Sequence, residues 1–384
     1  MRLISLIGIE IHKIMIYLDH NATTNINPKV WSKMNELVSY GPLNPSSIHS
    51  CGQKGKGLLE EARKSLAYLL GFESDRRKYQ ITFTASGTEA NNLIIANFKD
   101  NEIFISATEH LSIYAHSKYL KNITIVKVDK NGILDIDDLV NKLKKSKSAK
   151  KLLSVMLANN ETGIIQPIKK ICEIAHDYGA LVHSDCVQAV GKIDVDMQDL
   201  GIDFLSISGH KFGGPMGSAA LVARASVHLE PQIIGGGQER SLRSGTENVP
   251  AIVGFGFAAK LAKNELVERR AHMTKLQSKL EKLLLERGHL IEIAGADVER
   301  LPNTSLIFNL NKKAETQLIA LDLQGVAVSS GSACSSGKSV PSHVLSAMGY
   351  KEDKIQSALR VSVGMDTKEA DIDSFIEIYN KINK

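Results

Sequence analysis

Short apolar runs and helical patterns alternate along the first two thirds of the chain. Six β-branched, apolar runs predict buried strands at residues 81–84, 103–106, 123–128, 152–157, 180–184 and 204–207. Three stretches between them carry apolar residues at helical spacing, at residues 88–98, 136–145 and 168–178. This alternation predicts a mostly parallel sheet with helices on both faces, in which ligands bind at the carboxyl ends of the strands.

The last third of the chain follows a different pattern. From about Ile252 a long helical stretch runs to residue 288, and isolated strands are expected at 304–310 and 358–364. Further helices are expected to begin at Glu315 and Lys368. These elements indicate a second, smaller unit of mixed α+β type.

The fold class predicted from these patterns is therefore α/β. We expect a large α/β domain over residues 15–255 and a smaller α+β domain over residues 256–384, with the segment after Met15 packing on the smaller domain. A chain of 384 residues is long enough for this division.

Charge and hydropathy exclude two classes of partner. The net charge is +5, and the most basic run, residues 142–151, lacks the aromatic side chains that stack on bases. It falls where a helix is expected to end, so we interpret it as a solvated loop rather than a nucleic-acid patch. The apolar runs are too short to cross a bilayer, so a membrane partner is not expected either.

The cysteines indicate a reducing compartment. Cys51, Cys172, Cys186 and Cys334 are widely spaced and form no C-x-x-C pair, which favours a cytoplasmic protein over a disulfide scaffold or a zinc site. Residues 1–14 include a short apolar patch without a small-residue cleavage site, so no signal peptide is predicted. Met15 is an alternative start of the chain.

Three features lie at predicted strand ends. Gly87 and Thr88 begin a helix after "TFTAS", and a helix N-terminus is a good phosphate site, although Thr88 beside Glu89 is also typical of a helix cap. Asp185 ends a buried strand, where its carboxylate needs a partner, for which an ion pair with a lysine or arginine is the simplest choice. Lys211 follows the next strand in "SGHKFGGP", between glycines that a surface lysine does not require.

Taken together, these three features point to one chemistry. A phosphate cradle, a carboxylate that keeps a pyridine nitrogen protonated and a lysine able to form a Schiff base are what a protein contributes to pyridoxal phosphate chemistry. A second signal is Cys334, in "SSGSACSSGK". A cysteine among glycines and serines is expected to be an accessible nucleophile rather than a packed apolar residue.

The chain resembles the cysteine desulfurases, pyridoxal phosphate enzymes of aminotransferase fold type I. The matching segments are "YLDHNATT", "NPSSIHSCG", "TEH", "NNETG", "HSDCVQAVGK", "SGHKFGGP", "GGGQERSLRSGTEN", "SSGSACSSG" and "LRVSVG". They occur in order over nearly the whole chain after Met15. The wording around Cys334 is similar to the group that serves iron-sulfur cluster assembly.

The resemblance implies a role for each matching position. The cofactor-binding set is Gly87, Thr88, His110, Asn160, Asp185, Gln188, Ser208, His210, Lys211 and Thr246. Lys211, Cys334 and His110 would be catalytic, and Asn160 and Arg360 would hold the substrate carboxylate. Thr246 would come from the neighbouring subunit of a homodimer.

In more detail, Lys211 would bind the cofactor aldehyde and later move the substrate's α-proton. Asp185 would pair with the ring nitrogen and Gln188 would bond the ring hydroxyl. His110 would stack on the ring and transfer protons. Ser208 and His210 would lie beside the cofactor phosphate.

The implied reaction converts L-cysteine to L-alanine and leaves the sulfur on Cys334 as a persulfide. The implied partner is a scaffold protein that accepts the sulfur, and Cys334 could also ligate an iron-sulfur cluster shared with that scaffold. Selenocysteine lyase or aminotransferase activity on the same fold remains an alternative, as does a non-enzymatic binding protein. Taken singly, His110, Asn160, Thr246 and Arg360 also have ordinary structural interpretations.

Four positions depart from the family pattern. Cys186, after Asp185, replaces a common alanine, and we expect it to pack as a small apolar residue close to the cofactor ring. Gly87 also replaces an alanine, Asn25 a proline and Gly55 an alanine. None of these changes removes a reactive group.

Overall fold

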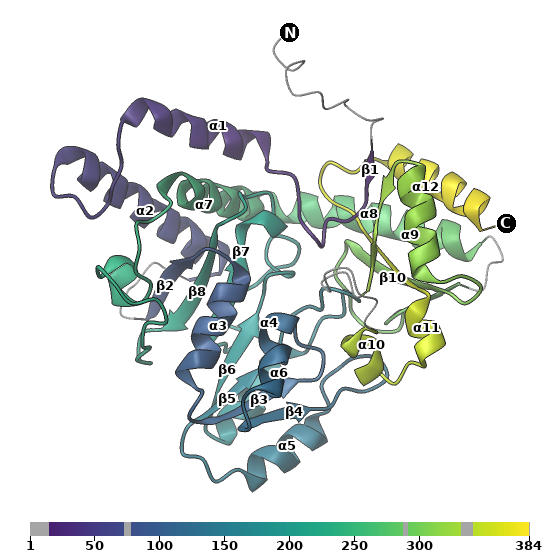
Figure 1. Cartoon of the computed structure of the whole chain (residues 1–384), viewed down its shortest axis with the longest axis horizontal. Coiled ribbons are helices and arrows are strands. Elements are labelled where there is room, and N and C mark those ends of the chain that lie inside the picture. The colour runs from purple at the N-terminus through teal and green to yellow at the C-terminus, as the bar shows by residue number, and fades with distance from the viewer. Residues whose placement is uncertain (1–14, 73–77, 287–290, 332–340, 384) are drawn as a thin grey trace.

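A seven-stranded sheet, covered by helices on both faces, forms the larger part of the molecule (Figure 1). The computed structural model describes residues 15–72, 78–286, 291–331 and 341–383. The strand order across this sheet is β2 (Tyr79–Thr84), β8 (Ala219–Arg224), β7 (Phe204–Ser208), β6 (Ala180–Asp185), β5 (Lys151–Ser154), β3 (Glu102–Ser106) and β4 (Ile123–Val126). All pairs are parallel except those of β8 with β2 and β7. The predicted α/β class with a mostly parallel sheet is confirmed.

Alternate side chains of each strand serve the two faces of this sheet. Ile103 and Ile105 of β3 pack in a cluster with Ile94 of α3, whereas Phe104 between them packs in the cluster that contains Ile171 of α6. Successive strand residues point to opposite faces, so both faces must be apolar where helices cover them. This explains why the strands appear in the sequence as continuous apolar runs.

The helices of the larger part are assigned as follows: α1 (Pro28–Glu36), α2 (Ser50–Leu69), α3 (Gly87–Asn97), α4 (Leu111–Tyr114), α5 (Ile136–Lys145), α6 (Ile168–Asp177) and α7 (Val249–Asn264). Short 3₁₀ turns are η1 (Leu37–Tyr40), η2 (Ala115–Lys118), η3 (Gly209–Lys211) and η4 (Gln238–Ser241). The long helical stretch expected after Ile252 is two helices, α7 and α8 (Leu266–Leu285), which are separated at Glu265.

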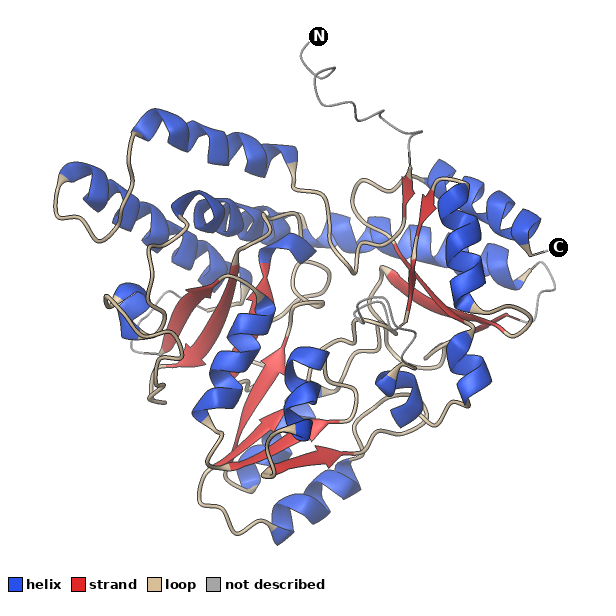
Figure 2. Ribbon diagram, in the orientation of Figure 1, coloured by secondary structure: helices blue, strands red, loops and turns tan. Residues whose placement is uncertain are grey.

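A smaller antiparallel sheet lies at the other side of the molecule (Figure 2). Its order is β12 (Ser329–Ser330), β13 (Ala358–Ser362), β10 (Thr304–Asn309) and β9 (Ile291–Ile293). The accompanying helices are α9 (Ala314–Leu323), α10 (His343–Ala347), α11 (Glu352–Gln356) and α12 (Glu369–Ile382). Apolar side chains of α8, α9 and α12 share one core with those of β10 and β13.

The N-terminal described segment packs on this smaller part. β1 (Ile16–Tyr17) pairs in parallel with β11 (Val326–Ala327), and Leu18 is fully buried in the core formed by α8 and α12. The chain then crosses to the larger part, where Thr24 donates a backbone hydrogen bond to His210 O at 2.9 Å. The division of the chain at residue 255 stays a prediction, since that residue lies inside α7.

Candidate active site

Lys211 is placed by the turn that follows β7. Gly209 and Gly214 approach each other so closely that a Cβ on Gly214 would lie 2.9 Å from Gly209 O, and Gly213 has a φ of +91°. Only glycine adopts these positions without strain. The glycines around the lysine therefore fold the chain back at once after the strand, which leaves Lys211 at its carboxyl end.

The segment 21–24 forms the wall beside this turn. The Lys211 ammonium group donates hydrogen bonds to the carbonyls of Asn21 and Ala22, the latter at 2.8 Å. His210 Nδ1 lies 3.1 Å from Thr23 Oγ1, and Thr24 donates through its hydroxyl to His210 O at 2.7 Å. Burial lowers the pKa of His210 to about 4, helped by the nearby cations of Lys211 and Lys192. His210 is therefore neutral near pH 7.

Helix α3 begins at the neighbouring strand end, as the sequence predicts. Its cap is Ser86, whose Oγ accepts from Glu89 N at 3.1 Å, so the alternative of a cap at Thr88 is wrong. The amides of Gly87 and Thr88 precede the first intrahelical bond, from Ala90 N to Ser86 O, which leaves them for an external acceptor. A Cβ on Gly87 would lie 2.9 Å from Val187 Cγ2, so the glycine keeps this helix end open.

Asp185 ends β6 with its side chain buried. Its Oδ1 accepts from Val187 N at 2.9 Å and its Oδ2 from Asn91 Nδ2 at 2.7 Å. Among the described residues Asp185 makes no ion pair, so the expected partner, a lysine or arginine, is replaced by neutral donors. Because both donors are neutral, the carboxyl group can still pair with a cationic group of a ligand.

Asn91 and Ser112 connect Asp185 to His110. Asn91 Nδ2 also donates to Ser112 Oγ at 2.8 Å, and Ser112 Oγ lies 2.8 Å from His110 Nδ1. Ser112 N donates to the same ring nitrogen at 3.1 Å, so Nδ1 is an acceptor and the neutral ring carries its proton on Nε2. Burial lowers the pKa of His110, and the Lys211 cation adds to this while Asp185 opposes it.

Arg360 comes from β13 in the smaller sheet and is buried. Its guanidinium donates to Asn160 O at 2.9 Å and pairs with Asp19 at 2.8 Å. Arg360 Nε and Asn160 Oδ1 are both buried without a hydrogen-bond partner. Since buried polar groups are costly unless paired, these two atoms point to a polar ligand beside them.

Asn21 forms hydrogen bonds with several of these side chains. Gln188 Nε2 donates to Asn21 O at 3.0 Å, and Gln188 Oε1 accepts from Lys192 at 2.8 Å. Lys192 also donates to Asn21 Oδ1 at 3.1 Å. The Lys192 side chain is buried, and burial, aided by the cations of Lys211 and Arg360, lowers its pKa well below the ordinary value. Gln188 is thus held in place from two sides.

Most of these groups, though not Lys192 or Asp19, line one cavity of about 300 Å³. Of the residues predicted from the sequence it brings together Gly87, Thr88, His110, Asn160, Asp185, Gln188, Ser208, His210, Lys211 and Arg360. Thr246 is exposed and does not line the cavity. Cys334 lies outside the described residues. Cys186 is not in the lining either; it is fully buried in the core, and burial raises the pKa of its thiol.

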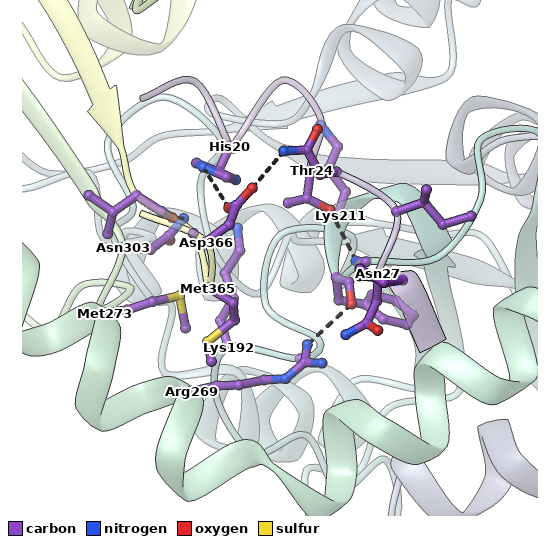
Figure 3. A pocket seen from close by; sticks show the side chains of 18 residues that line it. His20, Thr24, Asn27, Lys192, Lys211, Arg269, Met273, Asn303, Met365 and Asp366 are labelled. Carbon is purple, nitrogen blue, oxygen red and sulfur yellow. Dashed lines mark hydrogen bonds and ion pairs between the residues drawn. The ribbon is translucent and has the colours of Figure 1, made fainter. Parts of the chain in front are cut away.

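A second cavity, of about 270 Å³, lies on another side of Lys211 (Figure 3). Lys192, Lys211 and Arg269 contribute to its lining, and Asp366 lies at His20, 3.4 Å from the ring. Arg269 is already paired with Glu265 at 2.9 Å. The two cavities thus share Lys211 in their walls.

The first cavity fits pyridoxal phosphate. A free helix N-terminus suits a phosphate, a buried carboxylate suits a pyridinium nitrogen, and a lysine at a strand end suits an aldehyde. The unpartnered Asn160 Oδ1 and Arg360 Nε lie in the same lining and suit an amino acid bound to the cofactor.

A family model, aminotransferase class-V, matches residues 16–375. The chain belongs to this family. It is 40% identical over 373 residues to the cysteine desulfurase of Gluconacetobacter diazotrophicus, covering 94% of this chain and 92% of the relative. It is 37% identical to the cysteine desulfurase IscS of Dictyoglomus turgidum, covering 96% and 94%.

Solved structures agree with this assignment. A NifS-like protein from Rickettsia africae superposes with a TM-score of 0.92 at 46% identity, covering 96% of this chain and 99% of that one. A second NifS-like protein gives 0.87 at 34% identity, covering 96% and 99%. Class-V aminotransferases of this group are pyridoxal phosphate enzymes of fold type I, so the predicted fold and cofactor are confirmed.

The site residues missed in the sequence include Asn21, Asn91, Ser112 and Lys192. Asn91, three positions after Thr88, is on the same face of α3, a spacing that could have revealed it. Ser112, two residues after His110, could have been suspected as a polar neighbour. Lys192 contacts Gln188, four residues before it, but its contact with Asn21 depends on how the chain after β6 and segment 21–24 meet.

Within the described residues, no group of histidine, cysteine, aspartate and glutamate side chains could hold a metal ion. None of the described helices combines the length and hydropathy needed to span a bilayer.

Proposed function

We propose that the protein is a pyridoxal phosphate-dependent cysteine desulfurase that takes sulfur from L-cysteine onto Cys334 and releases L-alanine. One observation carries this: Lys211, Asp185, Asn160 and Arg360 line a single cavity, in a chain whose relatives are named cysteine desulfurases.

Each end of the cavity would hold one part of the cofactor. The amides of Gly87 and Thr88, with Ser208 and His210, would bind the phosphate. Asp185 would bind the ring nitrogen, Gln188 the ring hydroxyl, and His110 would stack on the ring. When bound, pyridoxal phosphate supplies an aldehyde that condenses with amines and a ring that accepts the electrons of a broken Cα–H bond.

Arg360 and Asn160 would bind the substrate carboxylate. Arg360 already contacts Asp19 and Asn160 O, so its geometry is fixed before substrate arrives. A preorganised guanidinium binds a planar carboxylate at two points, which orients the substrate's amino group and Cα–H toward Lys211.

Lys211 and His110 would move protons. The Lys211 amine, once released, can accept the α-proton. His110, with its pKa lowered by burial, is neutral near pH 7 and can accept the proton of the substrate thiol. A protonated histidine could not do this.

Cys334 would be the sulfur acceptor. Its thiolate attacks the sulfur of the bound cysteine, the Cβ–S bond breaks with its electrons left on carbon, and that carbon takes a proton. The products are a Cys334 persulfide and alanine, so sulfur, electrons and protons balance without an external oxidant. A reductant or an acceptor protein then removes the persulfide sulfur.

We also propose a homodimer in which Thr246 of one subunit completes the phosphate site of the other. Its exposed position, on the loop between η4 and α7, favours this role.

A cytoplasmic site of action is favoured by the free thiols of Cys51, Cys172 and Cys186. The proposed macromolecular partner is a scaffold protein of iron-sulfur cluster assembly, which could share Cys334 as a cluster ligand.

The decisive experiment is incubation with L-cysteine labelled at sulfur. We expect stoichiometric alanine and a labelled persulfide that peptide mapping places at Cys334. The Cys334→Ala variant should keep the cofactor absorption band and make no alanine. Label on another cysteine, or full activity of the variant, would refute the assignment; turnover of selenocysteine alone would favour the lyase alternative.

A further inference from the structure

Lys192 carries a buried amino group that has no anionic partner among the described residues. The residue is 3% exposed. It lines the second cavity (Figure 3), whereas Gln188, four residues before it, lines the first. The charged groups that act on it are Lys211 and Arg360, and both are cations. Because burial of an amino group in such surroundings is costly, stability alone does not explain why a lysine stands here.

The hydrogen bonds of Lys192 determine which end of the Gln188 amide faces each neighbour. The lysine amino group donates to Gln188 Oε1 at 2.8 Å. At the other end of the amide, Gln188 Nε2 donates to the backbone carbonyl of Asn21 at 3.0 Å. A lysine ammonium group can only donate and a carbonyl can only accept, so the two ends of the amide cannot exchange places. One proton of Nε2 is left for an acceptor in the first cavity.

Lys192 also holds Asn21, the residue that supplies this carbonyl. It donates to Asn21 Oδ1 at 3.1 Å, and Asn303 Nδ2 donates to the same oxygen at 3.0 Å. The other end of the Asn21 amide, Nδ2, donates to Asn160 O at 3.2 Å. Lys192 therefore holds Gln188 twice, directly and through the neighbour to which Gln188 donates.

We propose that Lys192 is a positioning residue for the cofactor: it holds the Gln188 amide so that Nε2 donates its second proton to the ring hydroxyl oxygen of pyridoxal phosphate. This inference rests on the proposed placement of Gln188 at that oxygen and goes beyond it, because Lys192 does not line the cofactor cavity. A donor at the ring oxygen withdraws negative charge that would otherwise hold a proton on the nitrogen joining Lys211 to the cofactor. That nitrogen should therefore lose its proton at a lower pH than it would without the donor.

The test measures the absorption of bound pyridoxal phosphate as a function of pH, because the absorption band changes when this nitrogen loses its proton. The full-length protein is used, loaded with cofactor and free of substrate. Lys192→Met removes the donor and nearly preserves the length of the side chain. We expect the midpoint of the absorption change to rise by about one pH unit, a tenfold increase in proton affinity.

A double variant separates positioning from a direct effect of the lysine's charge. Gln188→Met should raise the midpoint by a similar amount, and adding Lys192→Met to it should raise the midpoint no further. The other charged or titratable side chains of the cavity wall are the same in every variant: Asp185, His110, His210 and Arg360.

Lys151→Met is the matched control. Lys151 begins β5, at the end of the strand away from the site, and donates to Tyr178 O at 3.0 Å. The same substitution there should leave the midpoint unchanged.

An unchanged midpoint in Lys192→Met would overturn the proposal. So would an equal rise when Lys192→Met is added to Gln188→Met, because the lysine would then act through its charge alone. An unchanged midpoint in Gln188→Met would instead refute the placement of Gln188 at the ring hydroxyl, and this inference with it. Should Lys192→Met fail to fold because Gln188 Oε1 is left without a donor, the double variant, which lacks that oxygen, still gives the second comparison.

Discussion

His110 and Asp185 are joined by a hydrogen-bond path through two other side chains, Ser112 and Asn91. The carboxylate that would bind the cofactor nitrogen and the imidazole that would stack on its ring therefore share one fixed frame. Asn91 is the member of this path that contacts the carboxylate, since its Nδ2 donates both to Asp185 and to Ser112.

Replacing Asn91 should weaken the cofactor site without unfolding the protein. In Asn91→Ala, Asp185 loses one of its two donors and Ser112 loses its orienting bond. We expect pyridoxal phosphate to bind about tenfold more weakly, the loss typical of one hydrogen bond to a charged group. Fluorescence titration of the apoprotein measures this; Asn92→Ala, on the adjacent and less buried position of α3, is the control. Unchanged affinity for the cofactor would show that the remaining hydrogen bond from Val187 N is enough to hold Asp185 in place.

Arg360→Lys should damage substrate recognition selectively. A lysine cannot reproduce the planar contact to a carboxylate or the simultaneous bonds to Asp19 and Asn160 O. We expect KM for L-cysteine to rise about 10- to 100-fold, with cofactor affinity unchanged. Arg300→Lys, which alters a similar two-pronged pair with Glu281 away from the cavity, is the control. Equal effects of both changes would contradict a substrate role.

Stability should fall with rising pH because of Glu161. Burial raises the pKa of this carboxyl group from 4.5 to about 7, against the lowering effects of Ser342 and Arg360. A folded-state pKa above the unfolded one means that the folded protein binds the proton more tightly. The stabilising contribution is thus complete below pH 4.5 and lost as the pH rises to about 7, a span worth about 3 kcal/mol.

The Glu161→Gln variant removes this titration. Its free energy of unfolding minus that of the wild type should therefore be larger near pH 8 than near pH 5, which means that the variant gains stability relative to wild type as the pH rises. Urea unfolding at the two pH values, with the protein free of substrate, measures the difference. A difference that does not change with pH would mean that Glu161 is ionised throughout.

The loop that carries Thr246 depends on a buried ion pair. Glu239, Arg240 and Ser241 all have positive φ, between 47° and 65°. This backbone conformation is costly for residues other than glycine. Glu239 is held by Arg63 through two bonds, of 2.6 and 2.9 Å, and accepts from Phe83 N at 2.8 Å. The strained turn persists because its first residue is fixed in the core.

Arg63→Ala should therefore destabilise the protein by about 3–5 kcal/mol, because it leaves a buried carboxylate unpaired. Lys64→Ala removes the neighbouring but exposed pair with Glu61 and should cost less than about 1 kcal/mol. Thermal unfolding of the two variants gives the comparison. Similar melting temperatures would show that Glu239 finds another partner.

Much of this architecture could be predicted from the sequence because it depends on local pattern. Helix α5 has the predicted bounds, and each of the six predicted runs overlaps a strand. Strand β8 was missed: "AALVAR" follows a glycine-rich turn and carries no signal of its direction, which is set by its pairing with β2 and β7. The break at Glu265 also has no marker such as proline or glycine.

The site could be predicted only in part, for a similar reason. Lys211, Asp185 and Gly87 stand at strand ends, where topology alone brings residues together. Asn21, by contrast, contacts Thr304 and Ser362, which are distant in the chain, and no periodicity relates such positions. Asp19 likewise finds Arg360 only through the assembled fold.

The contact between Asn21 and Ser362 sets an order of events during synthesis. The two residues are separated by 341 positions, and the same separation divides Asp19 from Arg360. A ribosome must therefore release almost the entire polypeptide before the wall behind Lys211 can close. The nascent protein consequently cannot complete its substrate site early, even though the strands that carry Asp185 and Lys211 emerge long before the end of translation.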